Sequence, residues 1–145
     1  MIAFKLSQRD GARMDAAAHF QQLCEMLRSL LPARATLTAD CIGTLPGDCV
    51  ESLTLIANEL VTNAAKYAFS GRESGEITVG FREEGAGWRL WVEDNGNGLP
   101  PNYQDRSKNS FGRMLIATLA SRVNAEVTYS LGEGTRVSVS CGISR

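Results

Sequence analysis

The sequence predicts an α+β fold in which one mixed, mostly antiparallel sheet carries about three helices on one face. Apolar residues recur at helical spacing in three separate stretches, over residues 16–31, 48–69 and 111–123. Two further pairs of segments alternate apolar and polar residues around a glycine turn, which is typical of β-hairpins. Helices and sheets with one apolar face bury those faces against each other, so we expect a two-layer sandwich.

The first half of the chain supplies the first two helices and a strand. A weak alternation over residues 2–6 predicts a short strand. Asp15 then caps a helix of packing type whose apolar positions continue to the stop at Pro32. Residues 36–42 predict another strand, and the glycines and proline of residues 43–47 predict the turn that leads into the central helix.

The second half supplies the two hairpins and one more helix. Gly85-Ala86-Gly87 turns the first hairpin and Gly132-Glu133-Gly134 turns the second, with the hydroxyl of Thr135 just beyond that turn. In order, the four strands and the helix between them are predicted over residues 77–81, 88–92, 111–123, 125–131 and 137–141.

Length and composition describe one globular domain. A chain of 145 residues has the length of a single domain, so we expect one domain over residues 1–145, with about 68–70% of its unfolded surface buried. The net charge of −1 and the lack of a long basic face argue against a nucleic-acid partner. Because no apolar run approaches 18 residues and the N-terminus lacks a signal-peptide core, we expect a cytoplasmic segment that does not insert into membranes.

The cysteines and the single histidine do not form an evident metal site. Cys24, Cys41, Cys49 and Cys141 fall in no CxxC pair, so we expect reduced and mostly buried thiols. His19 lies on the flank of the first helix, where we expect a partly exposed side chain rather than a ligand or phosphoacceptor.

The helix from Leu55 to Phe69 carries two different faces. One is apolar and suits a core, whereas the other gathers Glu59, Asn63, Lys66 and Tyr67 at spacings where helical side chains meet. Carboxylate and carboxamide oxygens suit Mg²⁺, and an ammonium group suits phosphate oxygens. The alternative is a solvated helix face with no ligand.

The turn Asp94-Asn95-Gly96-Asn97-Gly98 follows the strand that ends near Val92. Two glycines let a backbone approach a flat ligand closely, and a carboxylate at the strand end can accept a hydrogen bond from an exocyclic amine. The same residues are also common in ordinary turns, so this motif alone is weak.

A long connection of thirteen residues, Leu99 to Phe111, comes next and is typical of lids and binding loops. Arg106 and Lys108 in this connection, with Arg113 just beyond it, make the region locally basic, which suits a polyphosphate, although a solvated loop would have the same composition. Residues 110–113 open a helix, whose N-terminal N–H groups favour an anion.

Taken in order, these motifs resemble the Bergerat-type ATP-binding domain shared by gyrase, heat-shock chaperone, histidine-kinase and mismatch-repair ATPases. The helix sequence Asn-Glu-Leu-Val-Thr-Asn-Ala-Ala-Lys-Tyr-Ala-Phe over residues 58–69 is most similar to the catalytic domain of bacterial sensor histidine kinases, in the short-lid subfamily related to the HWE kinases. Trp91-Val92-Glu93 matches the Trp-x-Glu of the HWE group, but Asn58 stands where that group has its histidine. The resemblance covers roughly residues 15–142, with the motifs in about 48–142, and favours the neighbouring subfamily.

This resemblance implies a site for ATP and Mg²⁺. Asn63 would be the Mg²⁺ ligand, and Glu59 would contact the metal or its water, so these two are the expected catalytic residues. Lys66 would meet a phosphate, Tyr67 would flank the adenine or ribose, and Thr135 would support the adenine end through its hydroxyl or a water.

The glycine motifs receive roles by the same resemblance. Asp94 would accept the adenine amine, Gly96 and Gly98 would clear space beside the base, and Gly112 would help the lid reach the phosphates. Ser110 stands where the family usually has the first glycine of its second glycine box, which leaves the lid geometry and turnover open.

The implied activity is that of a protein histidine kinase catalytic domain, a transferase of two-component signal transduction. It would donate the γ-phosphate of Mg·ATP to a histidine on the dimerisation domain of the same or a partner kinase, upstream of a response regulator. No acceptor or dimerisation domain is recognisable, because His19 is followed by Phe-Gln-Gln-Leu, unlike the family's acceptor motif. We therefore expect a monomer that binds ATP and does not autophosphorylate.

Two other functions remain open from the sequence. An anti-sigma-factor serine kinase uses the same fold as a small domain and would phosphorylate a serine on a partner. A degenerate module, kept for nucleotide binding or protein contacts without turnover, would fit the altered lid motif.

Overall fold

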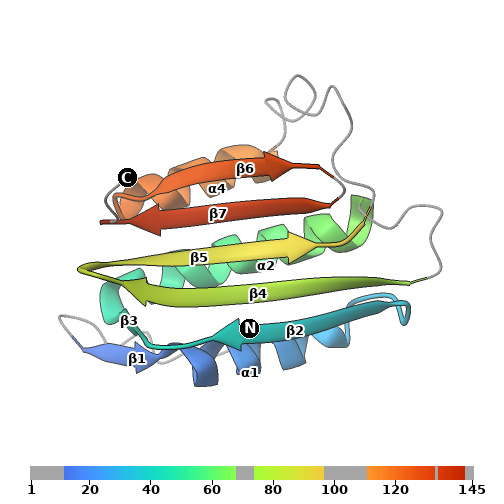
Figure 1. Ribbon diagram of the computed structural model, residues 1–145, viewed down its shortest axis with the longest axis horizontal. Helices are drawn as coiled ribbons and strands as arrows, with labels where there is room; N and C mark the ends of the chain where they lie inside the picture. Colours follow the sequence, from blue (N-terminus) through green and yellow to red (C-terminus); the bar gives the residue numbers. More distant parts are fainter. Residues whose placement is uncertain (1–11, 68–73, 97–110, 133, 143–145) are drawn as a thin grey trace.

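Three helices cover one face of a five-stranded sheet in the computed structural model of this chain (Figure 1). The structure describes residues 12–67, 74–96, 111–132 and 134–142. Within these residues, no helix covers the other face of the sheet, which faces the viewer in Figure 1. The predicted α+β two-layer sandwich is therefore confirmed.

The first helix, α1 (Ala16–Arg28), begins at the predicted cap. The Asp15 carboxylate accepts a hydrogen bond from Ala17 N at 3.1 Å, which satisfies one of the free N–H groups of the first turn. The helix ends earlier than its apolar spacing suggested. Leu30 consequently lies beyond the helix and is 74% exposed, so its assignment to the packing face was wrong.

The central helix, α2 (Val50–Tyr67), follows a single 3₁₀ turn, η1 (Gly47–Cys49). Its buried face packs on the sheet, and α4 (Phe111–Arg122) packs beside it. The buried residues of this face include Leu53, Ile56, Ala57, Leu60, Val61 and Ala64.

The sheet has the strand order β2-β4-β5-β7-β6, and only its first pair, β2 with β4, is parallel. A small antiparallel pair, β1 (Arg13–Asp15) with β3 (Thr44–Pro46), lies beside it and was not predicted. The strand predicted over residues 2–6 lies outside the described residues. The five strands are β2 (Ala35–Cys41), β4 (Gly75–Glu84), β5 (Gly87–Asp94), β6 (Glu126–Leu131) and β7 (Thr135–Cys141).

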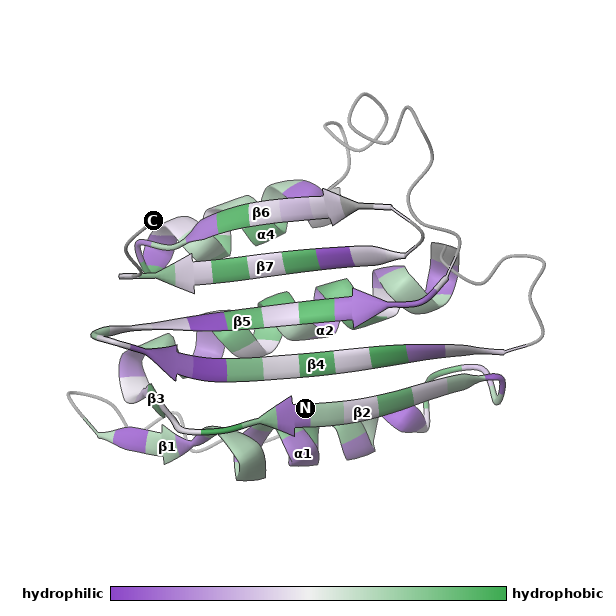
Figure 2. Ribbon diagram, in the orientation of Figure 1, coloured by the Kyte–Doolittle hydropathy of each residue, from purple (hydrophilic) through white to green (hydrophobic). Residues whose placement is uncertain are grey.

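The core lies between the sheet and the helices. Apolar residues alternate with polar ones along the strands, so one side of each strand faces the helices (Figure 2). The aromatic rings of Phe20, Phe81 and Trp88 lie in a row, with centroids 6.0 and 6.4 Å apart. This row joins α1 to β4 and β5.

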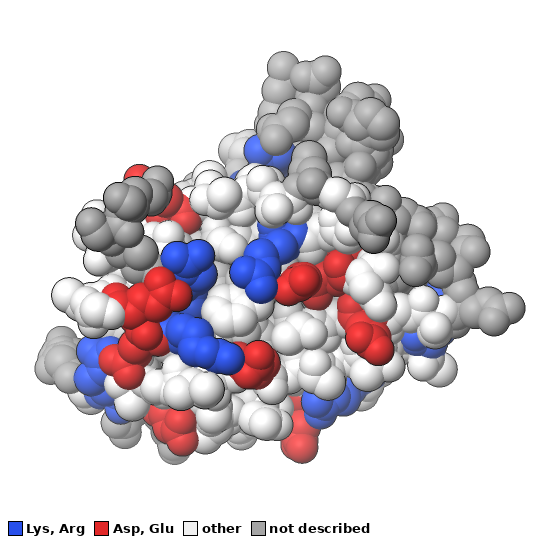
Figure 3. Space-filling model, in the orientation of Figure 1, with Lys and Arg blue, Asp and Glu red and all other residues white. Residues whose placement is uncertain are grey.

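The helix-free face of the sheet is charged, and basic and acidic groups lie close together over it (Figure 3). Pairs of opposite charge bridge neighbouring strands or turns. Within the described residues the pairs are Arg13–Glu83 at 3.2 Å, Arg82–Asp40 at 3.0 Å, Arg89–Glu84 at 3.2 Å and Arg136–Glu93 at 3.0 Å.

The prediction that His19 is partly exposed was wrong, because its side chain is 3% exposed between α1 and α2. Its Nε2 lies 2.7 Å from Thr54 Oγ1, and that hydroxyl donates to Val50 O at 2.7 Å. Since a hydroxyl has one proton to donate, Nε2–H is the donor to Thr54. Burial lowers the pKa of His19, which favours the neutral ring.

The four cysteines are free, as predicted, and none is fully exposed. Burial raises the pKa of Cys24 to about 11 and the pKa values of Cys41 and Cys49 to about 12. These three thiols therefore stay protonated near neutral pH. Among the described residues, no helix combines the length and the apolar character needed to cross a bilayer.

Candidate functional site

Segments that are far apart in the sequence meet at one end of the sandwich. The end of β5 lies beside the start of β7, because these strands are antiparallel neighbours. The C-terminal part of α2 and the start of α4 lie toward the same end, at the right in Figure 1. The predicted site residues that the structure describes are all on these segments.

Asp94 and Thr135 form a buried polar pair at this end. They are direct cross-strand partners, and each is 7% exposed. Their neighbours Glu93 and Arg136 are also cross-strand partners and point to the opposite, helix-free face, because side chains alternate along a strand. Asp94 and Thr135 therefore face the helix layer together.

The hydroxyl of Thr135 is buried and has no hydrogen-bond partner among the described residues. A buried hydroxyl without a partner is unfavourable, so this position suits a ligand group or an ordered water. This observation fits the role that the family resemblance implies for Thr135.

The turn after β5 is fixed by its own hydrogen bonds. Gly96 N donates to Asp94 Oδ1 at 2.9 Å, which stabilises the negative charge of that carboxylate. Asn95 accepts from Glu76 N at 2.8 Å through its side chain, and its own N–H donates to Glu76 O at 3.2 Å. No role was predicted for Asn95, although Asn is a common residue for such side-chain to backbone bonds.

The backbone of Gly134 packs closely against the backbone of Asp94. A Cβ atom at Gly134 would lie 2.1 Å from Asp94 O, so no side chain fits there without a shift of backbone. A hollow of about 430 Å³ opens beside this contact. Its described lining residues are Glu93, Asp94, Asn95, Ser130, Gly132, Gly134, Thr135 and Arg136.

The second group of site residues lies on α2. Glu59 and Asn63 are half-buried and Lys66 is exposed, and all three line a hollow of about 400 Å³ with the turn over residues 30–32. The oxygens of Glu59 and Asn63 are the hard donors that Mg²⁺ takes, and the ion keeps several waters in such sites. The donor set therefore fits Mg²⁺.

The start of α4 offers a third element. Gly112 is in its first turn, where the free N–H groups and the helix dipole favour an anion. This turn contains no acidic residue that would repel one. Arg113 stacks on Tyr129 of β6, with Cζ 4.3 Å from the ring centroid. This contact fixes the first turn of α4 against the edge strand.

The structure brings the predicted residues together as two groups rather than in one hollow. Asp94, Gly96 and Thr135 form one group and Glu59, Asn63 and Lys66 the other, and no described residue lines both hollows. Gly98, Ser110 and the side chain of Tyr67 lie outside the described residues.

Comparisons with known proteins agree on the kind of domain. A family model described as a histidine kinase-like ATPase domain matches residues 15–141. Blue-light-activated histidine kinase 2 of Erythrobacter litoralis is 27% identical over 114 residues, which cover 77% of this chain and 33% of that protein. Sensor histidine kinase PdtaS of Mycobacterium tuberculosis is 34% identical over 103 residues, which cover 70% of this chain and 20% of that protein.

The chain therefore spans a third or less of the length of these two relatives. Among solved structures, the histidine kinase domain of the Erythrobacter litoralis EL346 blue-light activated histidine kinase aligns with a TM-score of 0.79 at 22% identity. That alignment covers 92% of this chain and 67% of that chain. It shows that the two share a fold.

Proposed function

Because this chain belongs to the histidine kinase-like ATPase domain family, we propose that it binds Mg·ATP and donates the γ-phosphate to a histidine on a separate domain. The observation that carries the proposal is the buried pair Asp94 and Thr135, at the end of the sandwich where α2 brings Glu59, Asn63 and Lys66. A purine triphosphate needs a polar group for its base and a cationic group for its phosphates.

At the base end, Asp94 accepts a hydrogen bond from the adenine amine. Its carboxylate is already oriented by Gly96 N–H, so little ordering is needed when the base binds. The unpartnered Thr135 hydroxyl supplies a second polar contact beside it, directly or through a water. Guanine presents a carbonyl where adenine has its amine, so Asp94 disfavours GTP.

At the phosphate end, the α2 residues hold and orient the triphosphate. Asn63 and Glu59 hold the magnesium ion, whose charge offsets that of the phosphate oxygens. Lys66 contacts a phosphate as a point charge, and the start of α4 directs N–H groups toward an anion. Phosphoryl transfer depends mainly on such positioning and charge neutralisation.

The partner in this reaction is a dimerisation domain that carries the acceptor histidine, with a response regulator downstream. Such a transfer takes place in the cytoplasm, and this chain works there as a monomeric catalytic domain.

Nucleotide binding is the first test. Calorimetry of the purified chain with ATP and Mg²⁺ is expected to show binding that is tighter than with GTP. An absence of both heat and thermal shift at millimolar nucleotide would contradict the proposal and favour a module kept for protein contacts.

Phosphoryl transfer is the second test. The chain is mixed with radiolabelled ATP and with histidine-bearing dimerisation domains, and the product is treated with acid. An acid-labile phosphoprotein is expected, because phosphohistidine hydrolyses in acid. An acid-stable product would instead indicate the serine kinase activity of an anti-sigma factor.

A further inference from the structure

The indole of Trp91 lies flat on the helix-free face of the sheet, over the strand next to its own. Its direct cross-strand partner is Gly80, and a Cβ at Gly80 would lie only 2.1 Å from Trp91 Cε2. Trp91 is 9% exposed although no helix in the described part of the chain covers it. Its cover comes from neighbouring side chains on the same face.

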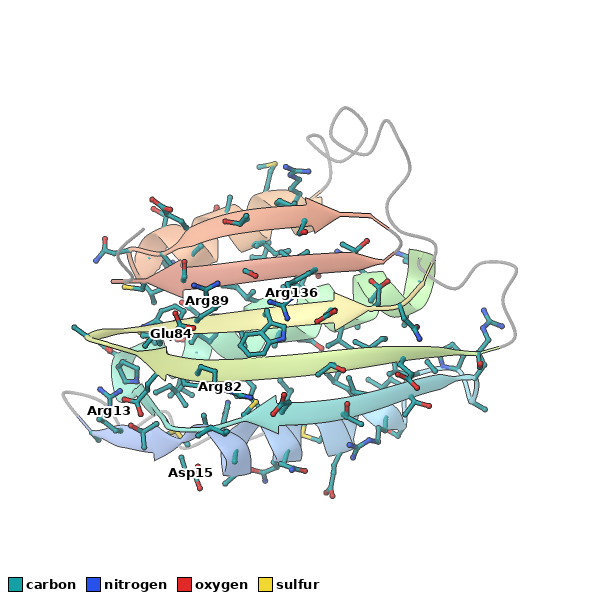
Figure 4. All side chains as sticks on the ribbon, in the orientation of Figure 1. Arg13, Asp15, Arg82, Glu84, Arg89 and Arg136 are labelled. Carbon is teal, nitrogen blue, oxygen red and sulfur yellow. The ribbon has the colours of Figure 1, made fainter. Side chains whose placement is uncertain are left out.

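Two arginines from two different strands lie against this ring. The guanidinium carbon of Arg82, on β4, is 5.4 Å from the ring centroid, and that of Arg136, on β7, is 5.0 Å from it. Figure 4 shows both labelled arginines on the side of the sheet that faces away from the helices. Both distances are within the range of cation–π attraction.

Each arginine is held in place by a carboxylate. Arg136 donates to Glu93 Oε1 from Nε at 3.3 Å and from Nη2 at 3.0 Å. Arg82 donates to Asp40 Oδ1 at 3.0 Å and to Asp40 O at 2.8 Å, which reaches the edge strand β2. Four neighbouring strands, β2, β4, β5 and β7, are thus linked around one indole.

We call Arg82, Trp91, Glu93 and Arg136 the open-face cluster. It lies directly behind the predicted base-binding pair, because Glu93 pairs with Arg136 in the sheet and the next pair in register is Asp94 with Thr135. Glu93 and Arg136 also line the same hollow of about 430 Å³ as Asp94 and Thr135. The open-face cluster and the Asp94–Thr135 pair therefore lie on opposite faces of the same short stretch of β5 and β7.

We propose that the open-face cluster is a positioning device that holds Asp94 and Thr135 at the separation and register that an adenine amine requires. The proposal rests on the proposed function, since it concerns how the same site distinguishes ATP from GTP. Arg82 and Trp91 do not line the hollow beside Asp94 and Thr135, and Glu93 and Arg136 border it from the helix-free face. They act through the backbone of β5 and β7.

A purely stabilising role would give a different pattern of effects. Exposed ion pairs add little to the stability of a fold, so loss of one such pair has a small effect wherever it lies on the sheet. Hydrogen bonds, however, weaken steeply with changes in distance and angle. A small movement of Asp94 relative to Thr135 therefore changes base selectivity more than stability.

The chain offers a matched control. Arg89 is on the same strand as Trp91 and on the same face, and it pairs with Glu84 at 3.2 Å, toward the other end of β5. Arg89→Gln and Arg136→Gln each remove one arginine and one ion pair from this face. Only Arg136→Gln removes a contact next to Asp94.

The experiment measures the ratio of dissociation constants for Mg·GTP and Mg·ATP, together with the thermal midpoint. We expect Arg136→Gln to lower this ratio about fivefold, which corresponds to about 1 kcal/mol in the difference between the two binding free energies. Arg89→Gln is expected to change it by less than about twofold, with a similar fall in the thermal midpoint. Arg136→Lys keeps a cation over the indole and is expected to recover most of the ratio.

A second variant disturbs the cluster without changing a charge. Gly80→Ala places a methyl group where the indole lies and so moves Trp91 away from its position. We expect the same loss of selectivity as in Arg136→Gln. If Gly80→Ala does not fold, Arg136→Gln and its control still decide the question.

Two outcomes would count against the proposal, and they are distinguishable. If the wild-type chain prefers ATP and Arg136→Gln loses no more selectivity than Arg89→Gln, the positioning role is wrong while the proposed function stands. If the wild-type chain binds neither nucleotide, the proposed function and this inference are both wrong.

Discussion

Asp94 is the residue to which the proposed function assigns recognition of the base. It is buried, it accepts a hydrogen bond from Gly96 N, and its cross-strand partner Thr135 has a buried hydroxyl without a partner among the described residues. A buried carboxylate at a strand end is unfavourable unless its charge is offset by donors. Gly96 N–H is one such donor, and under the proposed function the adenine amine is another.

Asp94→Ala should remove the preference for ATP over GTP. A hydrogen bond to a charged group contributes about 1.5–3 kcal/mol, so we expect affinity for ATP to fall about 10- to 100-fold. Calorimetry with both nucleotides measures this. Asp48→Ala, at an exposed carboxylate before α2, is the control and should leave both affinities unchanged. Equal affinity of the wild-type chain for ATP and GTP would contradict the role given to Asp94.

Asn63→Ala should weaken nucleotide binding far more with Mg²⁺ present than with Mg²⁺ absent. Asn63 supplies an oxygen donor to the hollow on α2, so its loss affects the metal-bound complex first. Titrations of ATP with Mg²⁺ and with EDTA measure the difference. Asn58→Ala changes the same residue type on the same helix outside that hollow, and it should not alter the Mg²⁺ dependence.

At the scale of elements, α1 and α2 share a buried polar contact through His19 and Thr54. The neutral ring is favoured there, because burial lowers the pKa of His19 in the folded chain. The unfolded chain then binds more protons than the folded chain just below the ordinary histidine pKa of about 6.5. Stability therefore falls as the pH falls through that range.

His19→Leu should remove this component of the pH dependence. We expect the free energy of unfolding of the wild-type chain to decrease between pH 8 and pH 5.5, and that of the variant to change less over the same range. Urea denaturation at several pH values measures both. Parallel curves for the two proteins would show that His19 titrates alike in the folded and unfolded states.

The contact between the turns after β5 and before β7 gives a second prediction at this scale. Gly134→Ala places a Cβ 2.1 Å from Asp94 O and should destabilise the fold by about 1–3 kcal/mol. Gly132→Ala is the matched control, because nothing lies within 4 Å of its Cβ, and it should stay within about 0.5 kcal/mol of wild type. Chemical denaturation compares them. Equal effects would show that the turn can relax.

At the scale of the whole molecule, a single domain over residues 1–145 stays a prediction, and the cooperativity of unfolding tests it. We expect one cooperative unfolding transition, as is usual for domains of this size. Trp88 and Trp91 report on β5 by fluorescence, and far-UV circular dichroism reports on the helices. The two midpoints should coincide, and added Mg·ATP should raise both. Different midpoints by fluorescence and circular dichroism would indicate that parts of the chain unfold independently.

Much of this architecture follows from local patterns in the sequence. The cap at Asp15, the period of the α2 face and the glycine turn at Gly85 each act within a few neighbouring residues, and the structure has the elements that they predict. The family recognised from the motifs is also the family whose model matches the chain. The cap, the helix period and the turn depend on interactions between residues close together in the chain, so a single sequence is enough to predict them.

Features that depend on distant packing were not predictable in the same way. The exposure of His19 was wrongly predicted because its partner Thr54 is 35 positions away, on another helix. The short β1–β3 pair has three residues in each strand, too few for a periodic signal. The open-face cluster draws Arg82, Trp91 and Arg136 from three strands, and only the order of strands in the sheet brings them together.

The place of β7 between β5 and β6 has a consequence for biosynthesis. A ribosome makes β5 and β6 before it makes β7, yet these two strands cannot join until β7 is inserted between them. The nascent polypeptide therefore exposes an unpaired edge of β5 until translation has passed residue 141, and Asp94 lacks its cross-strand partner Thr135 until β7 has been made. A product terminated before β7 would lack the Asp94–Thr135 pair and would be an expected target for chaperones and proteases.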